Sequence, residues 1–347
     1  MKIFDNHMHF GECKNIADTV QKYREIMERY KYEKINIVSL PYCSENDYQL
    51  DETANLCALY LKEKLNPKAY AYASLMHYKN ETGQDLLKQA KMLIAMGFDG
   101  FKTLDGKPNL RKAIGIPLDD EIYDLFFEYI EKEEIPYLIH VGDIEILWHP
   151  EQLPQHYVEK GWFYDESYKT NSELFDEAEG ILKKFPEMNI IFAHFMFKAN
   201  DIDYCTRLME TYPNIKFDLT PHPDMFTDFS AKRELWRKFF LKYSDRIIYC
   251  TDFYDIDVNE KTDRMVNIIK KFLECEKEVH VWDRDLKPVF LPREILEKIY
   301  YRNAESLVGN KAKAVNIQKL SEECEKLKNN SNIKYILEDL RKGDNNV

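Results

Sequence analysis

Two histidines near the start of the chain are spaced so that they could bind one metal ion. His7 and His9 follow the apolar residues Ile3 and Phe4, where a first strand would end. Side chains two positions apart on a strand point to the same side, so one cation can contact both imidazoles. The pair is weak evidence on its own, because the same spacing arises by chance in a partly buried strand.

Three further polar residues stand at the ends of apolar segments. His140 follows Pro-Tyr-Leu-Ile, His194 follows Ile-Ile-Phe-Ala, and Asp252 follows Ile-Ile-Tyr-Cys-Thr. Parallel strands of a barrel place such ends on one rim, which is where barrel active sites form. Buried imidazole and carboxylate groups are costly unless something pairs with them. We therefore predict a metal site of imidazoles and one carboxylate, a donor set that suits Zn²⁺ best and also accepts Mn²⁺, Fe²⁺ or Co²⁺.

Eight short apolar segments alternate with helical patterns along the chain. The expected strands begin at residue 3 and then cover residues 34–40, 68–75, 98–104, 136–141, 189–194, 215–219 and 246–252. Strict alternation predicts a parallel α/β sheet, and eight units predict closure into a (β/α)8 TIM barrel. The main alternative is an open doubly wound sheet. It would need a Gly-rich turn after the first strand, where this chain has His-Met-His-Phe-Gly instead.

The expected domain organisation is one barrel with an extension. Residues 1–309 are predicted to form a single metal-dependent barrel domain. Residues 310–347 are rich in Lys, Glu and Asn with weak helical spacing, so we expect an exposed C-terminal helical extension that is partly frayed at its end. The segment 142–171 is too long for a plain connector and is expected to cover the site.

Composition restricts the partners and the compartment. With 49 Lys+Arg and 61 Asp+Glu the net charge is −12, which argues against nucleic acid as a partner. No apolar stretch approaches the roughly 18–20 residues of a membrane helix, and the N-terminus becomes polar too early for a secretory signal. Seven cysteines without a C-x-x-C pair indicate reduced thiols. We therefore expect a cytoplasmic protein that does not bind membranes.

Five short motifs occur in an order that resembles the amidohydrolase superfamily. They are Phe4-Asp-Asn-His-Met-His-Phe10, Leu138-Ile-His-Val141, Ile191-Phe-Ala-His194, Tyr249-Cys-Thr-Asp252 and Ile299-Tyr-Tyr-Arg-Asn-Ala304. The chain is most similar to the amidohydrolase-2 branch, which includes aminocarboxymuconate-semialdehyde decarboxylase and related hydrolases. The motifs are spread over residues 3–304, which is nearly the whole predicted barrel.

The resemblance implies a division of roles among the five polar residues. It implies that one divalent metal, without an organic cofactor, is held by His7, His9, His140 and Asp252. It also implies that His194 is not a ligand and contacts the metal-activated water. A neutral imidazole is a usual proton acceptor, and Asp252 at the edge of the metal could carry the proton to the leaving group. His194 and Asp252 are thus the expected catalytic residues.

Five residues are candidate substrate contacts. Lys102 ends the fourth strand, and we favour a substrate-binding role for it. In binuclear members of the superfamily a lysine at this place is carbamylated and bridges two metals, and a solvated lysine without a role is the third option. TatD-type deoxyribonucleases, which the first strand also resembles, have an acidic ligand there instead. His222, Phe253, Tyr254 and Trp148 are further candidate substrate contacts.

Three functions follow from these expectations. The leading one is hydrolysis of a small carboxylate-bearing amide, ester or lactone by a metal-activated water. The second is non-oxidative decarboxylation of an aromatic or unsaturated carboxylic acid, a lyase reaction that the same residues could support. The third is a degenerate barrel retained for binding, against which the intact set of five residues argues. In each case the partner is a small molecule, and by analogy with such barrels a homodimer is expected.

Overall fold

Eight parallel strands form the centre of the molecule. The computed structural model describes residues 1–10, 15–44, 49–222, 224–254 and 256–344. The central strands are β1 Phe4–Met8, β2 Lys34–Val38, β5 Ala69–Ala73, β6 Gly100–Gly106, β7 Tyr137–Val141, β8 Ile190–Phe192, β9 Lys216–Asp218 and β10 Ile247–Ile248. Each overlaps a segment that the sequence predicts to be a strand, although β6 extends two residues beyond the predicted 98–104, and they are hydrogen-bonded in chain order.

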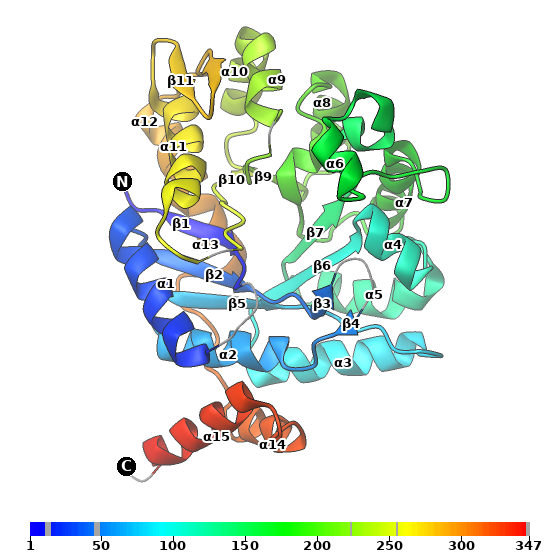
Figure 1. Cartoon of the computed structure of the whole chain (residues 1–347), viewed down its shortest axis with the longest axis vertical. Coiled ribbons are helices and arrows are strands. Elements are labelled where there is room, and N and C mark those ends of the chain that lie inside the picture. The colour runs from blue at the N-terminus through cyan, green and yellow to red at the C-terminus, as the bar shows by residue number, and fades with distance from the viewer. Residues whose placement is uncertain (11–14, 45–48, 223, 255, 345–347) are drawn as a thin grey trace.

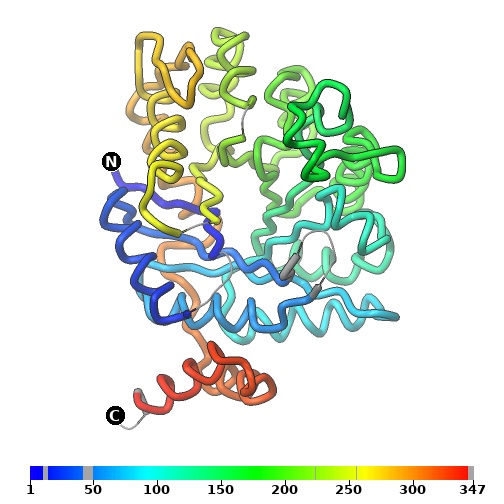
Figure 2. The backbone as a smooth tube through the Cα atoms, in the orientation of Figure 1, coloured from blue at the N-terminus to red at the C-terminus, as the bar shows by residue number. Residues whose placement is uncertain are grey.

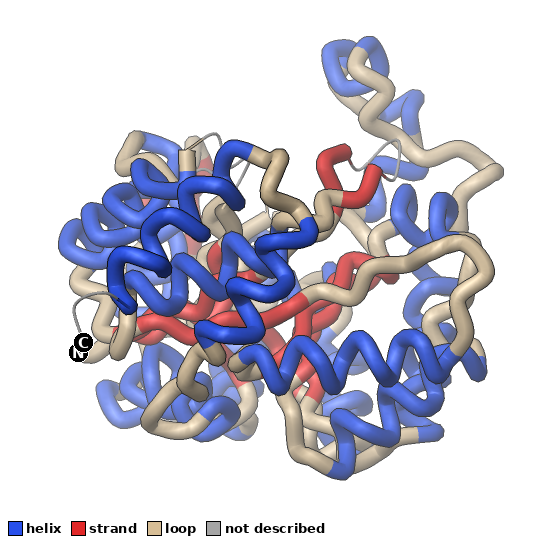
Figure 3. The backbone as a smooth tube through the Cα atoms, turned by 90° about the horizontal axis from the view of Figure 1, so that it is seen from below, coloured by secondary structure: helices blue, strands red, loops and turns tan. Residues whose placement is uncertain are grey.

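The first and last strands meet and nearly close the sheet into a barrel. The N–H of Asp252 donates to His7 O at 2.8 Å, and the N–H of His9 donates to Phe253 O at 2.7 Å. A parallel bridge joins Met8 to Phe253 between them. These contacts, which we call the closure seam, confirm the (β/α)8 TIM barrel and show that the open doubly wound alternative is wrong. Figure 3 shows the strands surrounded by helices.

Two strands end before the residues predicted to end them. β8 ends at Phe192 rather than at His194, and β10 ends at Ile248 rather than at Asp252. His194 and Asp252 have φ angles of 53° and 55°. This left-handed backbone cannot continue an extended strand. Each residue therefore turns away from its strand at the rim of the barrel.

The helices pack around the barrel (Figure 1). They are α1 Ile16–Tyr30, α2 Ala54–Lys64, α3 Gly83–Met96, α4 Pro108–Ile114, α5 Asp124–Lys132, α7 Asn171–Lys184, α8 Ile202–Thr211, α9 Met225–Ala231, α10 Arg233–Lys242, α11 Glu260–Glu274, α12 Arg293–Glu297 and α13 Asn303–Val308. In α1 the buried residues Ile16, Val20, Tyr23 and Met27 recur at helical spacing and form one apolar face. None of the helices in the described ranges is long and apolar enough to cross a membrane.

Short elements interrupt the regular alternation. Two antiparallel hairpins, β3 Tyr42–Ser44 with β4 Gln49–Leu50 and β11 Val279–Val281 with β12 Arg284–Leu286, follow β2 and α11. The segment 142–171 contains η2 Glu145–Trp148, η3 Pro150–Gln152 and α6 Gln155–Glu159. Single turns η1 Glu121–Tyr123, η4 Ala193–Phe197 and η5 Lys298–Arg302 complete the described elements. The sequence predicts neither hairpin.

The C-terminal helices pack on the outside of the barrel. α14 Ile317–Lys326 and α15 Ser331–Asp344 lie beyond α2 and α3 (Figure 2, red). Leu320, Ile333 and Ile336 are fully buried, so the predicted extension is exposed on one side only. The connection to it is held by Asp99, which accepts hydrogen bonds from Lys313 N at 2.8 Å and from Lys62 Nζ at 2.6 Å. Of the frayed tail predicted to begin at Gly343, the first two residues belong to α15, and residues 345–347 lie outside the described residues.

A buried network fastens the rim of the barrel to the helix layer. His77, after β5, lies between Asp105 of β6 and Glu81, with distances of 3.0 Å from Nε2 to Oδ2 and 2.6 Å from Nδ1 to Oε1. The hydroxyl of Tyr123 donates to the same Asp105 oxygen at 3.1 Å. Burial alone would lower the pKa of His77, but the two carboxylates outweigh it and raise the pKa to about 10.

We expect α15 to unfold together with the barrel, so that truncation of Ile336 destabilises the whole domain. Ile336→Ala deletes a fully buried side chain and should lower the free energy of unfolding by about 2–5 kcal/mol. Lys334→Ala, at an exposed position of the same helix, is the matched control and should change it by less than about 0.5 kcal/mol. Urea denaturation followed by tryptophan fluorescence measures both. A separate early transition, with the main one unchanged, would show that residues 310–347 unfold independently.

The His77 network predicts a pH-dependent stability. Because the folded pKa of about 10 lies above the ordinary 6.5, protonated His77 stabilises the fold fully below pH 6.5 and loses this contribution as the pH rises toward 10. The loss of unfolding free energy in His77→Gln should therefore shrink between pH 6.5 and pH 10. His156→Gln, at an exposed position, is the control. A difference that stays constant or grows with pH would contradict the prediction.

Candidate metal centre

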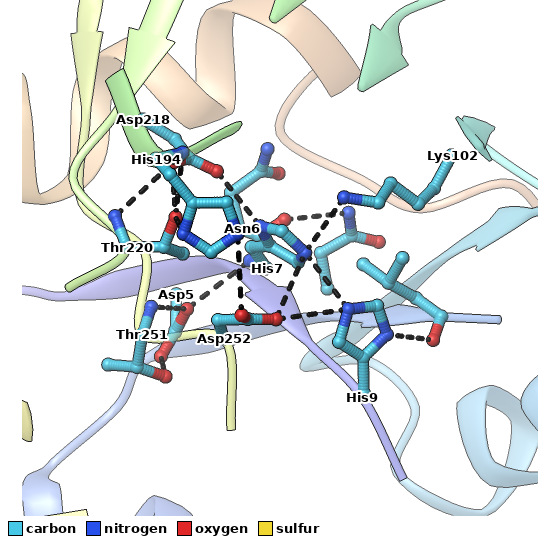
Figure 4. Close-up of polar contacts among 12 residues, drawn as sticks. Asp5, Asn6, His7, His9, Lys102, His194, Asp218, Thr220, Thr251 and Asp252 are labelled. Carbon is cyan, nitrogen blue, oxygen red and sulfur yellow. Dashed lines mark hydrogen bonds and ion pairs between the residues drawn. The ribbon is translucent and has the colours of Figure 1, made fainter. Parts of the chain in front are cut away.

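Three residues from the first and last strand segments of the barrel converge on one point. The Nε2 atoms of His7 and His9 are 3.0 Å apart, and Asp252 Oδ1 lies 3.4 Å from the first and 3.1 Å from the second (Figure 4). Within the described residues these three form the group whose donor atoms all lie within 4.8 Å of one another. The convergence is a direct consequence of the closure seam, since His7, His9 and Asp252 supply its hydrogen bonds.

The other nitrogen of each histidine is held from behind. His7 Nδ1 is 2.8 Å from Asp218 Oδ2, and His9 Nδ1 is 3.0 Å from Val38 O. Both partners are acceptors, so Nδ1 carries the proton in each ring and Nε2 keeps its lone pair toward the shared point. Metal-binding histidines are usually oriented in this way. The two imidazoles and the carboxylate therefore fit a divalent metal such as Zn²⁺ or Mn²⁺.

Lys102 points to the same place from β6. Its Nζ lies 3.2 Å from His7 Nε2, and the residue is fully buried (Figure 4). Burial lowers the pKa of Lys102 to about 8. A protonated amine and a divalent cation repel each other at such distances. With a metal in place, Lys102 must therefore lose its proton or face a negatively charged group.

His140, predicted as the fourth ligand, is not in the converging group. It lies on β7 and is 7% exposed, but its Nε2 is 3.0 Å from Gly142 O. Its ring stands edge-on to that of His194 with centroids 5.0 Å apart. Burial, followed by the neighbouring His194, lowers the pKa of His140 well below its ordinary value. The neutral ring has donor atoms suited to a metal, and its ligand role stays a prediction.

His194 faces the second oxygen of Asp252. Its Nε2 is 3.6 Å from Asp252 Oδ2, while its Nδ1 is 3.1 Å from Thr220 Oγ1. Asp252 thus directs Oδ1 to the histidine pair and Oδ2 to His194. Burial would raise the pKa of Asp252, but His7 and then His9 and His194 outweigh it and hold the pKa well below its usual range. The ionised carboxylate of Asp252, between the histidine pair and His194, is therefore placed to move a proton.

Two carboxylates that the sequence analysis missed support the site. Asp5, on β1, accepts hydrogen bonds from Thr251 Oγ1 at 2.6 Å and His7 N at 3.2 Å, beside the closure seam. Asp218, on β9, accepts from His7 Nδ1 and from the backbone N of His194. Asp5 lies in β1 and Asp218 ends β9, and an acidic residue in a strand expected to be buried is the signal that could have identified them.

Among the predicted substrate contacts, His222 lies next to the site. It is 8% exposed, and neither ring nitrogen has a hydrogen-bond partner among the residues that the structure describes. Its ring centroid is 5.0 Å from that of Phe197, which in turn stacks on His194 at 5.0 Å. Burial lowers the pKa of His222 to about 3. A neutral imidazole with unused donor and acceptor capacity therefore stands one aromatic ring away from His194.

The other three predicted contacts lie in different surroundings. The ring of Phe253 is 1% exposed and packs against Tyr30 of α1, so its backbone rather than its ring reaches the metal motif. Tyr254 is 47% exposed. Trp148 in η2 donates from Nε1 to Lys169 O at 3.2 Å and packs against Tyr164. The described contacts of the Phe253 and Trp148 side chains are thus with residues other than His7, His9 and Asp252.

The sequence matches a known family. The family described as Amidohydrolase matches residues 48–309. This range includes His140, His194 and Asp252 and begins after His7 and His9. No curated protein matches the chain.

Several solved structures share the fold over most of their length. For 4-oxalomesaconate hydratase from Rhodopseudomonas palustris the TM-score is 0.56 at 15% identity, covering 88% of this chain and 95% of that one. A dihydroxybenzoic acid decarboxylase from Polaromonas, with bound manganese and 2-nitroresorcinol, has a TM-score of 0.56 at 13% identity, covering 88% of this chain and 96% of that one. A candidate 2-pyrone-4,6-dicarboxylic acid hydrolase from Pseudomonas putida has a TM-score of 0.51 at 11% identity, covering 89% of this chain and 97% of that one. At such identities the likeness shows the fold and not the reaction.

The geometry predicts that loss of one converging histidine releases the metal. We expect the wild-type protein to hold about one divalent ion per chain after dialysis and His9→Asn to hold far less, because a closed set of ligands is broken. The metal content is measured by inductively coupled plasma mass spectrometry. His149→Asn, at a half-exposed position outside the group, should keep the wild-type content. In the same assay, a wild-type content in His140→Asn would contradict a ligand role for His140.

Proposed function

The chain belongs to the amidohydrolase superfamily, in its amidohydrolase-2 branch, and we propose that it is a metal-dependent hydrolase of a small carboxylate-bearing amide, ester or lactone. The observation that carries the proposal is the split use of Asp252. One oxygen faces the His7–His9 pair at 3.4 and 3.1 Å, and the other lies 3.6 Å from His194. This arrangement joins a metal centre to an acid–base pair, which is what metal-assisted hydrolysis requires.

One divalent metal is proposed, held by His7, His9, Asp252 and, after rotation of its ring, His140. Zn²⁺ suits this donor set best, with Mn²⁺, Fe²⁺ or Co²⁺ as alternatives; the Polaromonas decarboxylase with the same fold holds manganese. When bound, the metal supplies an activated water and polarises a substrate oxygen. A second metal would require carbamylation of Lys102, which remains the alternative for that residue.

The chain's own residues then handle the protons. Asp252 is placed to accept the proton that the attacking water loses and to pass it to the leaving nitrogen or oxygen. His194 is placed to accept a hydrogen bond from the attacking water and so orient it, since its Nε2 faces the site and its Nδ1 is held by Thr220. The two residues are 3.6 Å apart, so proton transfer between them needs only a small movement.

We propose that Lys102 binds the carboxylate of the substrate. The described hydrogen-bond partner of its buried Nζ is His7 Nε2, a neutral group. A buried ammonium gains most from a charged partner. His222, with two unused ring nitrogens, is proposed as a second polar contact. We also propose Trp148, Tyr254 and the backbone of Phe253 as substrate contacts, which would form only when the substrate binds. We further propose a cytoplasmic homodimer without a nucleic-acid or membrane partner.

Non-oxidative decarboxylation of an aromatic or unsaturated acid is the second candidate. The structural likeness to a dihydroxybenzoic acid decarboxylase favours it. The metal would orient the substrate, and the protonated member of the His194–Asp252 pair would deliver its proton to the carbon that loses CO₂. Hydrolysis and decarboxylation thus use the same residues and differ in the atom that receives the proton.

Replacement of His194 separates metal binding from turnover. We expect His194→Ala to keep about one metal per chain and to lose activity by at least about 10²-fold, because a positioned acid–base group is removed. Asp252→Asn should lose activity and part of the metal. Activity is measured on a panel of small esters, amides and lactones that carry a carboxylate, and CO₂ release is measured in parallel with hydroxybenzoates. Full metal loss in His194→Ala would overturn the assignment, and CO₂ release without hydrolysis would select the second candidate.

A further inference from the structure

One buried carboxylate is hydrogen-bonded to both halves of the site. Asp218 is fully buried, and its Oδ2 lies 2.8 Å from His7 Nδ1. Its Oδ1 accepts from His194 N at 2.7 Å and from Thr220 N at 3.2 Å, and it also accepts from the Thr220 hydroxyl (Figure 4). Four donors thus use both oxygens of a single carboxylate, which is about all that such a group can accept.

The Thr220 hydroxyl is equally constrained. It donates its only proton to Asp218 Oδ1, because an ionised carboxylate can only accept. Its oxygen is then an acceptor toward its other two neighbours, His194 N at 3.0 Å and His194 Nδ1 at 3.1 Å. Nδ1 of His194 must therefore carry a proton, which leaves the lone pair of the neutral ring on Nε2.

The backbone around His194 needs this support. Residues 194–197 all have φ angles between 49° and 54°. A left-handed conformation costs roughly 1–2 kcal/mol per residue for an L-amino acid that is not glycine. His194 N, at the start of this turn, donates to both Asp218 Oδ1 and Thr220 Oγ1. The strained turn is thus fastened to β9 at the residue whose ring has to face Asp252.

We propose that Asp218 is a positioning residue that fixes the tautomer and ring orientation of His7 and His194 together. It acts directly on Nδ1 of His7 and through the Thr220 hydroxyl on Nδ1 of His194, so that both Nε2 atoms present lone pairs to the same point. This inference rests on the proposed function for its catalytic meaning. The tautomers themselves follow from the hydrogen bonds alone, and they can be measured without a substrate.

The tautomers are read from nitrogen chemical shifts. In protein with ¹⁵N-labelled histidine, two-bond ¹H–¹⁵N spectra distinguish a protonated Nδ1 from a protonated Nε2, and His7→Gln and His194→Gln variants assign the two rings. In the metal-free wild-type protein we expect a protonated Nδ1 in both. Thr220→Val should change the tautomer of His194 and leave that of His7 intact, whereas Thr220→Ser, the matched control, should restore the wild-type spectrum.

Asp218→Asn completes the test, because a side-chain amide has one acceptor oxygen where the carboxylate has two. At least one histidine should lose its Nδ1–H tautomer. If His7 is the one affected, the dissociation constant for Zn²⁺, measured by chelator competition, should rise about 10–100-fold. Thr220→Val should leave that constant within about threefold while activity falls.

The possible results separate this inference from the proposed function. Unchanged tautomers of both rings in Thr220→Val and Asp218→Asn would overturn the positioning role, even if the enzyme is a hydrolase. Altered tautomers with an unchanged Zn²⁺ constant in Asp218→Asn would support the positioning role and count against His7 as a ligand. If Asp218→Asn does not fold, the comparison of Thr220→Val with Thr220→Ser still decides whether the hydroxyl controls His194.

Discussion

The hydrogen bonds that close the barrel are the constraint on which the site depends. Asp252 N donates to His7 O, and His9 N donates to Phe253 O, so the strand ends that complete the fold also carry the converging side chains. Asp5 accepts from both sides of this seam, through His7 N and Thr251 N at 3.2 and 3.1 Å. The spacing of the donor atoms is therefore fixed by main-chain geometry and not by side-chain packing alone. A change that opened the seam would separate the side chains of His7, His9 and Asp252.

This dependence explains how much the sequence could predict. Apolar segments, their alternation with helices and the rule that parallel strand ends share a rim were enough to bring His7, His9 and Asp252 to one place. Rules of that kind describe extended strands. They do not reach the left-handed turn that carries His194, or the rotamer that turns His140 Nε2 toward Gly142 O. The left-handed turn is held by Asp218 and Thr220, which lie 24 and 26 residues further along the chain than His194.

Asp218 shows the same limit from another side. Its position in a strand expected to be buried is visible in the sequence, but its partners lie 211 residues before it and 24 residues before it in the chain. A charge at that place is costly unless several donors surround it, and only the closed barrel supplies them. The sequence thus indicates that such a residue has a reason to be there, while the reason becomes apparent only when the closed barrel brings the side chain of His7 and the backbone after β8 to Asp218.

The proposed carboxylate-bearing substrate is compatible with the balance of buried charge. Burial would raise the pKa of Asp218 and Asp252, but the histidines beside them lower it, so the site carries two negative charges. A divalent cation would neutralise both. Lys102, 3.2 Å from His7 Nε2, would then be a positive charge in excess unless it gave up its proton. A substrate carboxylate restores neutrality with the ammonium intact, and the desolvated pair that results is stronger than one at the surface. Substrate binding and metal binding would therefore strengthen each other. The substrate carboxylate would offset the charge of the Lys102 ammonium, which repels the cation, and the cation would offset the charge of the two aspartates, which repel the substrate.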